Sequence, residues 1–510
     1  MMKYRLFKRI ALRINAILLC VLLCGCTVQA EFVPQLPQST ALPPPPLSDE
    51  PRSAHLELYF LMADSRLGAE QREISWKTGT SRAKAAVEAL CAGPNNPSFS
   101  SVVPRSLKLV DVELSGDICT VDFSGTLSND RELLIMRAAI AATVFANEGS
   151  LYTDVLINGV QPGYKGRPLG IQKPVEIPLD SYISALEKEY QVYEQEELPE
   201  AGAFETRDAQ IYFLDTSGSL LLSDARTLRY DKQAELELIV AALVGELAKG
   251  PVESIGREPV LPANMRLLKT AYMQTAQKSD LQADNNVPLT KGILELYFEQ
   301  PKERFNEAAV FACLIYSVTG FCPNIEGVRI FIGETATDAS KILGLKDGAN
   351  RDYFLRSDFK SRLGHTITLN FPDADGLGLY PVLRALPQVE AESPKARISE
   401  LFRGPADPGI SLSLYNEEEL LSVSLQGNMA VVNWAPGFSK KLLEFVKSGV
   451  SHIPPNARAQ MYLYSVINTL SEIPGITRVW MLEDGRRIDE TIDRIYLGNP
   501  LFANPGFMLV

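Results

Sequence analysis

Acidic side chains are the first candidates for catalysis in this chain, and their surroundings favour a structural role. Asp122 lies in the predicted strand Val121-Asp122-Phe123, but the equivalent strand positions elsewhere in the chain hold Tyr297 and Asn433. A general acid or base would then be present in only one of three related strands. We interpret Asp122 as a strand residue that makes turn hydrogen bonds.

The histidines do not complete a nucleophilic site. There are three, His55, His365 and His452, and two of them stand beside Leu or Ile. The motifs of serine hydrolases, phosphate-binding loops and zinc proteases do not occur. The sequence therefore predicts no catalytic residue, and we expect that the protein is not an enzyme.

The seven cysteines fit neither a disulfide framework nor a zinc pattern. Cys91 and Cys119 fall on apolar faces of their predicted helix and strand, as small buried hydrophobic residues do. Cys313 and Cys322 could pair within one repeat, which the sequence leaves open. Residues 373–376 begin like a calcium-binding loop but lack its final Glu, so an Asx turn is favoured. No metal and no cofactor is predicted.

Cys26 is the residue for which the sequence predicts a modification. A basic start up to Arg13 is followed by an apolar stretch of 12 residues, 14–25, and by the closing run Leu23-Cys24-Gly25-Cys26. That run resembles a bacterial lipobox, in which cleavage falls before the last Cys and its thiol carries diacylglycerol. The stretch is too short to span a bilayer, which takes about 20 residues. We expect a lipoprotein signal peptide at residues 1–25 and lipidation at Cys26; the alternative is a plain signal peptide with an incidental Cys.

The remainder of the chain is acidic. Removal of residues 1–25 takes away five positive charges, so the formal net charge moves from −12 to −17. Such a surface does not suit phosphate backbones, and no nucleic acid partner is expected. By the same reasoning, contact with the cell membrane would come through the lipid on Cys26. The Pro-rich residues 26–52 are predicted to form an extended tether.

Three Gly-Pro pairs divide the rest of the chain into similar parts. Gly93-Pro94, Gly250-Pro251 and Gly404-Pro405 each follow a helix-like run, and they stand 157 and 154 residues apart. Gly adopts the left-handed conformation that commonly ends a helix, and a following Pro cannot continue it. Around each pair we predict the order β-β-α-β-β-α-β. The predicted fold class is α+β, with three tandem small domains that each pack two helices on a small mixed β-sheet.

The repeat also predicts domain boundaries. In each copy the second helix carries a hydroxyl at a matching place, Thr143, Ser317 or Thr469. A stretch at 440–456 delays this helix in the third copy. The expected segments are the signal peptide 1–25, the tether 26–52, domain 1 at 53–170, an acidic linker at 171–206, domain 2 at 207–334 with an insertion at about 274–288, a linker at 335–361, and domain 3 at 362–510.

The ordered set of motifs resembles the GerM domain of bacterial lipoproteins tied to sporulation and spore germination. The set comprises the lipobox, the Pro-rich tether, the Gly-Pro helix stop, the strand around Asp122, a helix with Thr143, and a closing turn at Asn158-Gly159 or Asp484-Gly485. The second copy departs most, because Tyr297 replaces the acidic strand residue. The resemblance implies a fold similar to the ring-building motifs of envelope assembly proteins. It implies no catalytic residue.

The resulting hypothesis is a non-catalytic, lipid-anchored binding or scaffold lipoprotein outside the membrane of a Gram-positive bacterium, acting in sporulation or spore germination. Its expected partners are the cytoplasmic membrane, envelope or sporulation proteins, and further copies of itself. The alternative is a cell-wall-associated enzyme, or an enzyme accessory, acting on peptidoglycan. A third reading is a small-ligand site in domain 3, if Trp434 and Trp480 lie close together.

Overall fold

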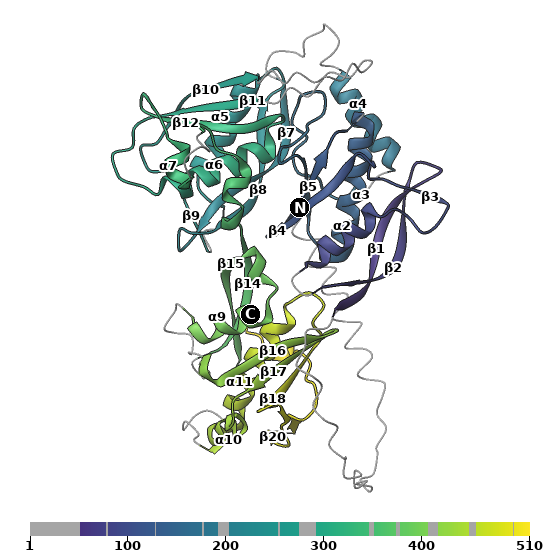
Figure 1. Cartoon of the computed structure of the whole chain (residues 1–510), viewed down its shortest axis with the longest axis vertical. Helices are drawn as coiled ribbons and strands as arrows, with labels where there is room; N and C mark the ends of the chain where they lie inside the picture. The colour runs from purple at the N-terminus through teal and green to yellow at the C-terminus, as the bar shows by residue number, and fades with distance from the viewer. Residues whose placement is uncertain are drawn as a thin grey trace, which may run out of the picture. The chain divides into compact units, whose positions relative to one another are not determined.

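The computed structural model describes most of the chain after the predicted tether (Figure 1). The described residues are 51–77, 80–127, 129–175, 178–191, 203–252, 256–274, 292–345, 351–373, 378–405, 417–447, 455–492 and 494–509. The predicted signal peptide, Cys26 and nearly all of the predicted tether lie outside them. Within these residues, no helix has the length and apolar character needed to cross a membrane.

The first copy consists of two small sheets and two helices. Strands β1 and β2 form an antiparallel hairpin that the short β3 extends, while β4, β5 and β6 form a second sheet with β4 antiparallel and β6 parallel to β5. Helix α2 follows the hairpin, and α3 connects β5 to β6. The bounds are β1 Arg52–Met62, β2 Leu67–Trp76, α2 Arg82–Cys91, β3 Phe99–Ser100, β4 Leu107–Ser115, β5 Ile118–Gly125, α3 Asp130–Glu148 and β6 Tyr152–Ile157.

The second copy repeats this order and these pairings. Its hairpin is β7 with β8, extended by β9, and its second sheet has the order β10-β11-β12-β13, with β11 and β12 parallel. The bounds are β7 Phe204–Asp215, β8 Leu221–Asp231, α5 Leu236–Ala248, β9 Arg257–Glu258, β10 Leu267–Gln274, β11 Gly292–Phe298, α6 Glu307–Phe321, β12 Ile325–Ile332 and β13 Thr335–Ala336.

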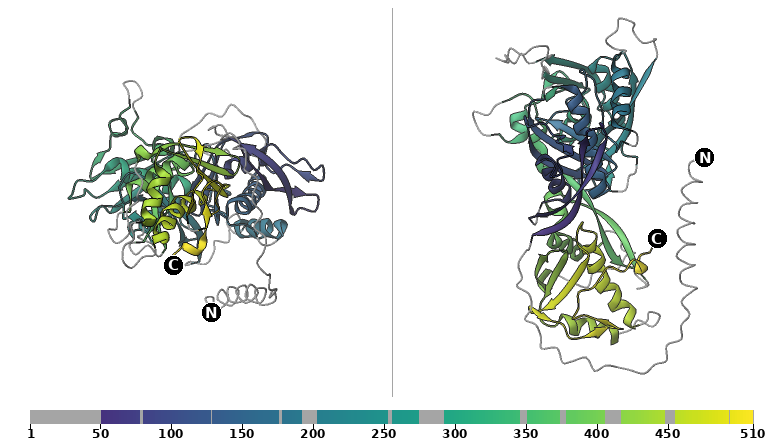
Figure 2. Two further views of the ribbon diagram at one scale, coloured as in Figure 1. Left: turned by 90° about the horizontal axis from the view of Figure 1, so that it is seen from below. Right: turned by 90° about the vertical axis from the view of Figure 1, so that its right-hand side faces the viewer.

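The third copy has the same plan with additions. Its hairpin is β14 with β15, and its second sheet has the order β16-β17-β18-β19, with β17 and β18 parallel. The additions are the helices α8 and α10, the small β20-β21 hairpin, and two 3-10 turns. Figure 2 shows this copy, coloured green to yellow, from two further sides. The bounds are β14 Gly364–Pro372, β15 Leu379–Pro387, α8 Gln388–Ala391, α9 Pro394–Arg403, η2 Glu417–Glu419, β16 Leu420–Gln426, β17 Met429–Trp434, α10 Phe438–Lys447, α11 Pro455–Ser471, β18 Arg478–Glu483, β19 Arg486–Arg487, β20 Thr491–Ile492, β21 Ile495–Tyr496 and η3 Pro505–Phe507.

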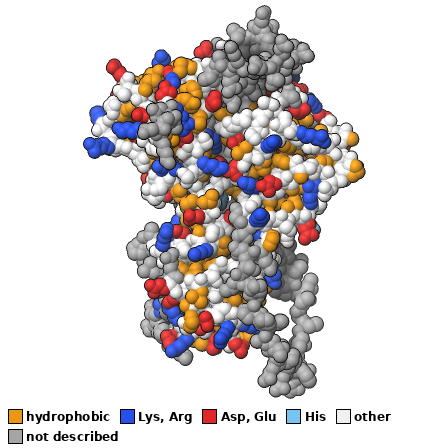
Figure 3. All heavy atoms as spheres, viewed as in Figure 1, with side chains coloured by type: hydrophobic (Ala, Val, Ile, Leu, Met, Phe, Trp, Pro, Cys, Tyr) orange, Lys and Arg blue, Asp and Glu red, His pale blue; other side chains and the backbone are white. Residues whose placement is uncertain are grey.

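The segments between copies are also folded where they are described. Helix α4 (Leu179–Gln191) packs on α3 through Leu179 and Ile183. Helix α7 (Ala339–Leu343) and the 3-10 helix η1 (Arg356–Arg362) connect the second copy to the third. Charged side chains of both signs are interspersed over the face drawn in Figure 3.

Each copy has its own hydrophobic core. One aromatic side chain from the hairpin and one from the second sheet lie in each core, and all six have no solvent exposure. Full burial of a Phe side chain stabilises a fold by about 1.5–3 kcal/mol. These residues are Phe60 and Phe123 in the first copy, Phe213 and Phe298 in the second, and Phe371 and Trp434 in the third.

A hydroxyl from the second helix of each copy binds the first strand. Thr143 accepts a hydrogen bond from the backbone N–H of Tyr59 at 3.1 Å, and Ser317 accepts one from that of Tyr212 at 2.9 Å. In the third copy the backbone N–H of Asn370 donates to Thr469 at 2.9 Å. These bonds satisfy a donor of the hairpin that would otherwise be buried without a partner, which explains why the sequence places a hydroxyl there three times.

The structure confirms the predicted α+β class and the order of helices and strands. The glycines of the three helix stops, Gly93, Gly250 and Gly404, have φ of 88°, 78° and 74°, a conformation that Gly adopts without steric cost. The structure adds that the strands of each copy form two separate hydrogen-bonded sheets. The insertion predicted at about 274–288 begins where β10 ends, and its residues from 275 onward lie outside the described residues. The domain boundaries stay predictions.

Candidate functional site

Asp122, the acidic residue considered for catalysis in the sequence, stabilises a turn. Its Oδ1 accepts a hydrogen bond from the backbone N–H of Gly159 at 2.9 Å, and Asn433 does the same for Gly485 at 2.7 Å in the third copy. Asn158 and Gly159 both have positive φ, as a tight strand connection requires. The side chain is half-buried, and this burial raises the pKa of Asp122 above its usual range.

Sequence reasoning missed an arginine that recurs at the helix stop. Arg72, Arg226 and Arg384 lie on the second hairpin strand of their copies. Each donates to the carbonyl of the stop glycine, at 3.0 Å to Gly93, 2.6 Å to Gly250 and 2.6 Å to Gly404. An acidic side chain pairs with each guanidinium. The available signal was an Arg that precedes the stop glycine by about 20 residues in every copy.

The interface between the first two copies, which we call the seam, lies around Arg356 of the 3-10 helix η1. Its guanidinium lies 4.0 Å from the ring centroid of Tyr316, donates to the Tyr316 carbonyl at 2.9 Å, and donates to the Tyr212 hydroxyl at 3.2 Å. A Cβ on Gly320 would lie 3.3 Å from Arg356 Nη1 and 3.4 Å from Asp154 Oδ2, so Gly320 allows both groups to approach α6. Arg356 thus binds the second copy directly and acts on Asp154 of β6 in the first copy through its charge.

The side of the seam from the first copy is acidic. Asp154 has no solvent exposure, and burial raises its pKa to about 6 although the charges of Arg137 and Arg356 oppose that rise. Burial likewise raises the pKa of Glu113, which the charge of Arg356 opposes. Thr120 donates to Gln210 at 3.2 Å across the same seam. Thr120 is thus bonded across the seam, and Asp154 and Glu113 lie buried within reach of the charge of Arg356, so part of the outer face of the first copy's second sheet lies against the second copy.

The three copies meet near the start of β14. Ser223 donates to the Ser115 carbonyl at 2.6 Å, and the Ser115 hydroxyl donates to the Gly364 carbonyl at 3.4 Å. A Cβ on Gly364 would lie 2.9 Å from Leu220 Cβ, so only Gly fits there without a shift of its neighbours. The contacts join β4, β8 and β14, one strand from each copy.

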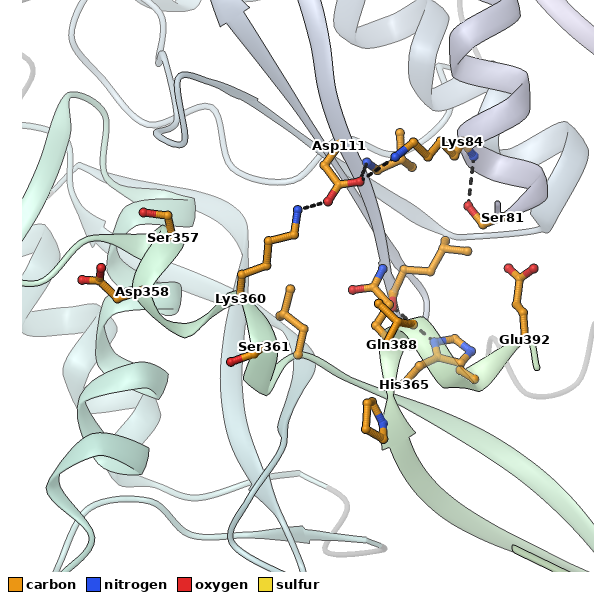
Figure 4. Close-up of a pocket in the computed structure, with 16 residues that line it drawn as sticks. Ser81, Lys84, Asp111, Ser357, Asp358, Lys360, Ser361, His365, Gln388 and Glu392 are labelled. Carbon is orange, nitrogen blue, oxygen red and sulfur yellow. Dashed lines mark hydrogen bonds and ion pairs between the residues drawn. The ribbon is translucent and has the colours of Figure 1, made fainter. Parts of the chain in front are cut away.

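A pocket of about 660 Å³ opens beside this meeting point (Figure 4). Asp111 lies between two lysines, and accepts from Lys84 at 3.1 Å and from Lys360. Burial opposes ionisation of Asp111, but these two hydrogen bonds hold its pKa below the usual range. His365 Nδ1 lies 3.2 Å from the Leu114 carbonyl oxygen, and burial lowers the pKa of the imidazole.

The polar contacts around the pocket are those of an interface between copies. Both lysines are engaged by Asp111, and the Ser81 hydroxyl accepts from the Lys84 backbone N–H as the N-cap of α2. Glu392 pairs with Arg52 at 3.3 Å. A nucleophile would need a base within hydrogen-bonding reach, and the contacts described here do not form such a pair.

The cysteines described by the structure are unpaired. Cys313 lies within α6 and Cys322 directly after it, and both are free, buried thiols. Burial raises the pKa of Cys91 to about 11 and that of Cys119 still further, which keeps these thiols protonated and weakly nucleophilic. In the described ranges, no three His, Cys, Asp or Glu side chains gather as a metal site would require.

The suggestion that Trp434 and Trp480 lie close together is wrong. Trp434 faces the core and stacks on Phe438 with ring centroids 4.5 Å apart. Trp480 pairs in register with Val431, three residues earlier on β17, so it points to the opposite face of the sheet. Its Nε1 donates to the Gly498 carbonyl at 3.2 Å. Side-chain alternation along β17 and β18 separates the two indoles.

The fold and the seams define a class of protein, a tandem array of α+β domains that bind one another through sheet and helix faces. Residues 57–162 and 368–489 match the Germane family, described as "Sporulation and spore germination". These two matches fall in the first and third copies, and they confirm the GerM resemblance. A comparison with curated protein sequences finds no match.

Solved structures of low similarity were also found. The tandem GerMN domains of the sporulation protein GerM from Bacillus subtilis are 17% identical, with a TM-score of 0.21 and coverage of 59% of this chain and 98% of that one. The first GerMN domain of the same protein is 19% identical, with a TM-score of 0.19 and coverage of 28% and 99%. A putative lipoprotein from Clostridium perfringens is 18% identical, with a TM-score of 0.15 and coverage of 22% and 78%. We base no functional inference on similarities of this size.

Proposed function

We propose that this protein is a non-catalytic, lipid-anchored scaffold that acts outside the cytoplasmic membrane in sporulation or spore germination. The observation that carries the proposal is the seam around Arg356. It places Asp154 on a sheet face of the first copy close to α6 of the second, and Thr120 of the first copy donates to Gln210 of the second across the same seam. A fold whose faces bind other copies of the same fold is suited to assembly.

The hydrogen bonds of Asp122, the residue considered for catalysis, also support a binding role. Asp122 is engaged in the turn at Gly159, and its counterpart Asn433 performs the same task without an ionisable group. The Germane family is described by a process, sporulation and germination, and its description names no reaction. The scaffold therefore works through its surfaces.

The sequence supports the proposed lipid anchor and the proposed location outside the cytoplasmic membrane. Leu23-Cys24-Gly25-Cys26 resembles a lipobox, and the Pro-rich residues 26–52 would hold the folded copies away from the bilayer. Diacylglycerol on Cys26 would retain the protein at the outer side of the cytoplasmic membrane of a Gram-positive cell. Envelope or sporulation proteins would then be its partners.

Fractionation of cells that express the full chain tests this proposal. We expect the protein in the membrane fraction with diacylglycerol detectable on Cys26 by mass spectrometry, and we expect Cys26→Ala to remain uncleaved and without the lipid. Cys91→Ala is the matched control and should behave as the parent does. Absence of lipid on Cys26 in the parent would contradict the anchor. Release of peptidoglycan fragments that Asp122→Ala abolishes would favour the enzyme alternative.

A further inference from the structure

The pocket beside Asp111 is lined by three separate parts of the chain (Figure 4). Helix α2 and strand β4 belong to the first copy, η1 precedes the third copy, and β14 and α8 belong to the third copy. Its volume of about 660 Å³ falls within the roughly 300–1,000 Å³ that small-molecule sites occupy, and such sites are common where domains meet. A small ligand in this pocket would touch the first and third copies at once.

One part of the pocket is apolar. Val112, Leu363 and Ala391 line it and are buried, and the half-buried Leu114 lines it as well. Val389 also lines the pocket and is 86% exposed. An apolar group in the pocket would remove part of this surface from water, which favours binding.

Two lysines supply the positive charge of the pocket. Figure 4 shows the side chains of Lys84 and Lys360 pointing to Asp111. An ammonium group has three N–H donors, so one bond to Asp111 leaves donors on each lysine. Lys360 Nζ also lies 3.9 Å from Glu113. The side chains of Lys84 and Lys360 are 32% and 52% exposed, so a second anion can reach both.

The other carboxylates that line the pocket have cations of their own. Asp358 pairs with Arg351, and Glu392 pairs with Arg52 at 3.3 Å. The two lysines and the single ionised Asp111 then leave one formal positive charge among the lining groups. A ligand with one negative charge would balance it.

Two neutral polar groups complete this end of the pocket. His365 Nδ1 donates to the Leu114 carbonyl at 3.2 Å, and burial lowers the pKa of the imidazole, so the ring adds no charge. The Ser81 hydroxyl accepts from the Lys84 backbone N–H and keeps its own proton for a further acceptor. The two lysines are therefore the lining groups that set the charge of a ligand.

We propose that this pocket binds a small carboxylate with an apolar chain. The carboxylate oxygens accept from Lys84 and Lys360, and the chain packs on the apolar part formed by Val112, Leu363 and Ala391. Because these residues come from the first copy, from η1 and from the third copy, the bound ligand stabilises the contact between copies. This binding goes beyond the proposed scaffold function and requires no lipid on Cys26.

Equilibrium dialysis of the full chain tests the proposal. Octanoate is the probe, and octanol and octylammonium, which have the same apolar chain and a neutral or a cationic head group, are its controls. We expect one octanoate per chain, bound at least tenfold more tightly than either control. Octanoate that is not retained at millimolar concentration, or is retained no better than octanol, would overturn the proposal.

Two substitutions of opposite charge distinguish a ligand site from a structural contact. Lys360→Met should weaken octanoate binding at least tenfold and leave octanol binding unchanged. Asp111→Asn removes the carboxylate that competes for both lysines, and it should tighten octanoate binding severalfold. Lys440→Met, at an 82% exposed side chain, is the matched control and should change neither. Equal weakening of both probes by Lys360→Met, or weaker octanoate binding in Asp111→Asn, would contradict the assigned site.

A photoreactive probe locates the bound chain. Octanoate that carries a diazirine should label peptides from β4, η1 or α8, and an excess of plain octanoate should suppress this labelling. Labelling confined to other peptides would also overturn the proposal. Lipid on Cys26 and capture of envelope proteins are measured separately, so the scaffold function can stand if octanoate does not bind.

Discussion

The first and second copies use the same strand positions for opposite purposes. Asp122 on β5 and Tyr297 on β11 occupy equivalent places, but the first copy's face is acidic and covered while the second copy's is aromatic and half-open. The inward neighbours Phe123 and Phe298 are the same residue type and are both fully buried. Core positions are thus set by the fold, and outward positions are set by what each copy contacts.

The second helices of the copies show the same difference between inward and outward positions. Thr143 and Ser317 both bind the first strand of their copy and are buried. Two residues later, Phe145 of α3 is exposed, whereas Thr319 of α6 is buried and its carbonyl accepts a hydrogen bond from the Gln161 N–H of the first copy. Substitutions at the seam should therefore affect the relation between copies, whereas substitutions at inward positions should affect one copy.

Removal of Arg356 should have the largest effect. Arg356→Ala leaves buried Asp154 without one of the charges that favour its ionised form and removes the contact with Tyr316. We expect a loss of about 3–5 kcal/mol in the free energy of unfolding, measured by urea denaturation. The control Arg266→Ala removes an ion pair whose Arg side chain is 77% exposed and should leave the free energy of unfolding nearly unchanged. Equal losses in both variants would contradict the assigned role of the seam.

The pH dependence of stability should report the buried carboxyls. Burial raises the pKa of Asp154 to about 6 and that of Glu148 to about 7. Because these folded-state values exceed those of the unfolded chain, the folded chain binds more protons between about pH 4 and 7, and stability falls as pH rises through this window. Asp154→Asn and Glu148→Gln should each remove about 2 kcal/mol of that fall in thermal unfolding followed across pH. A slope identical to that of the parent would contradict the burial of these groups.

The recurring arginines should each support their own copy. Arg384→Met leaves the Gly404 carbonyl without its donor and Glu400 with Arg403 alone, and should cost about 1–3 kcal/mol by the same denaturation measurement. Arg226→Met should cost a similar amount because it breaks the equivalent bond to Gly250. Arg403→Ala, whose side chain is 73% exposed, is the control and should change stability by less than about 1 kcal/mol. If Arg384→Met left the free energy of unfolding unchanged, the recurring arginine would not contribute to stability.

The smallest change is expected at Asp122. Asn433 accepts the equivalent bond in the third copy, so Asp122→Asn should alter the free energy of unfolding by less than about 0.5 kcal/mol. Asp122→Ala removes the acceptor of the Gly159 N–H and should cost about 1 kcal/mol. Equal costs for the two variants would show that the charge, rather than the hydrogen bond, is what the fold requires.

Local signals made much of the fold predictable. The stop glycines, the alternation around Phe123 and the hydroxyl at Thr143 act within a few residues or repeat at fixed places, and the structure bears them out. The division of each copy into two sheets was not predictable, because alternation shows which face a residue occupies and not which strand it pairs with. Arg356 escaped prediction since it lies in a stretch read as a linker, and its partners Tyr212 and Tyr316 are distant in sequence.

Hydrogen–deuterium exchange of the full chain, compared between the parent and Arg356→Ala, tests most directly whether the copies hold one another through these faces. The account predicts faster exchange in both β6 of the first copy and α6 of the second, with the third copy's α11 unchanged. Acceleration confined to η1, or spread evenly over all three copies, would contradict it.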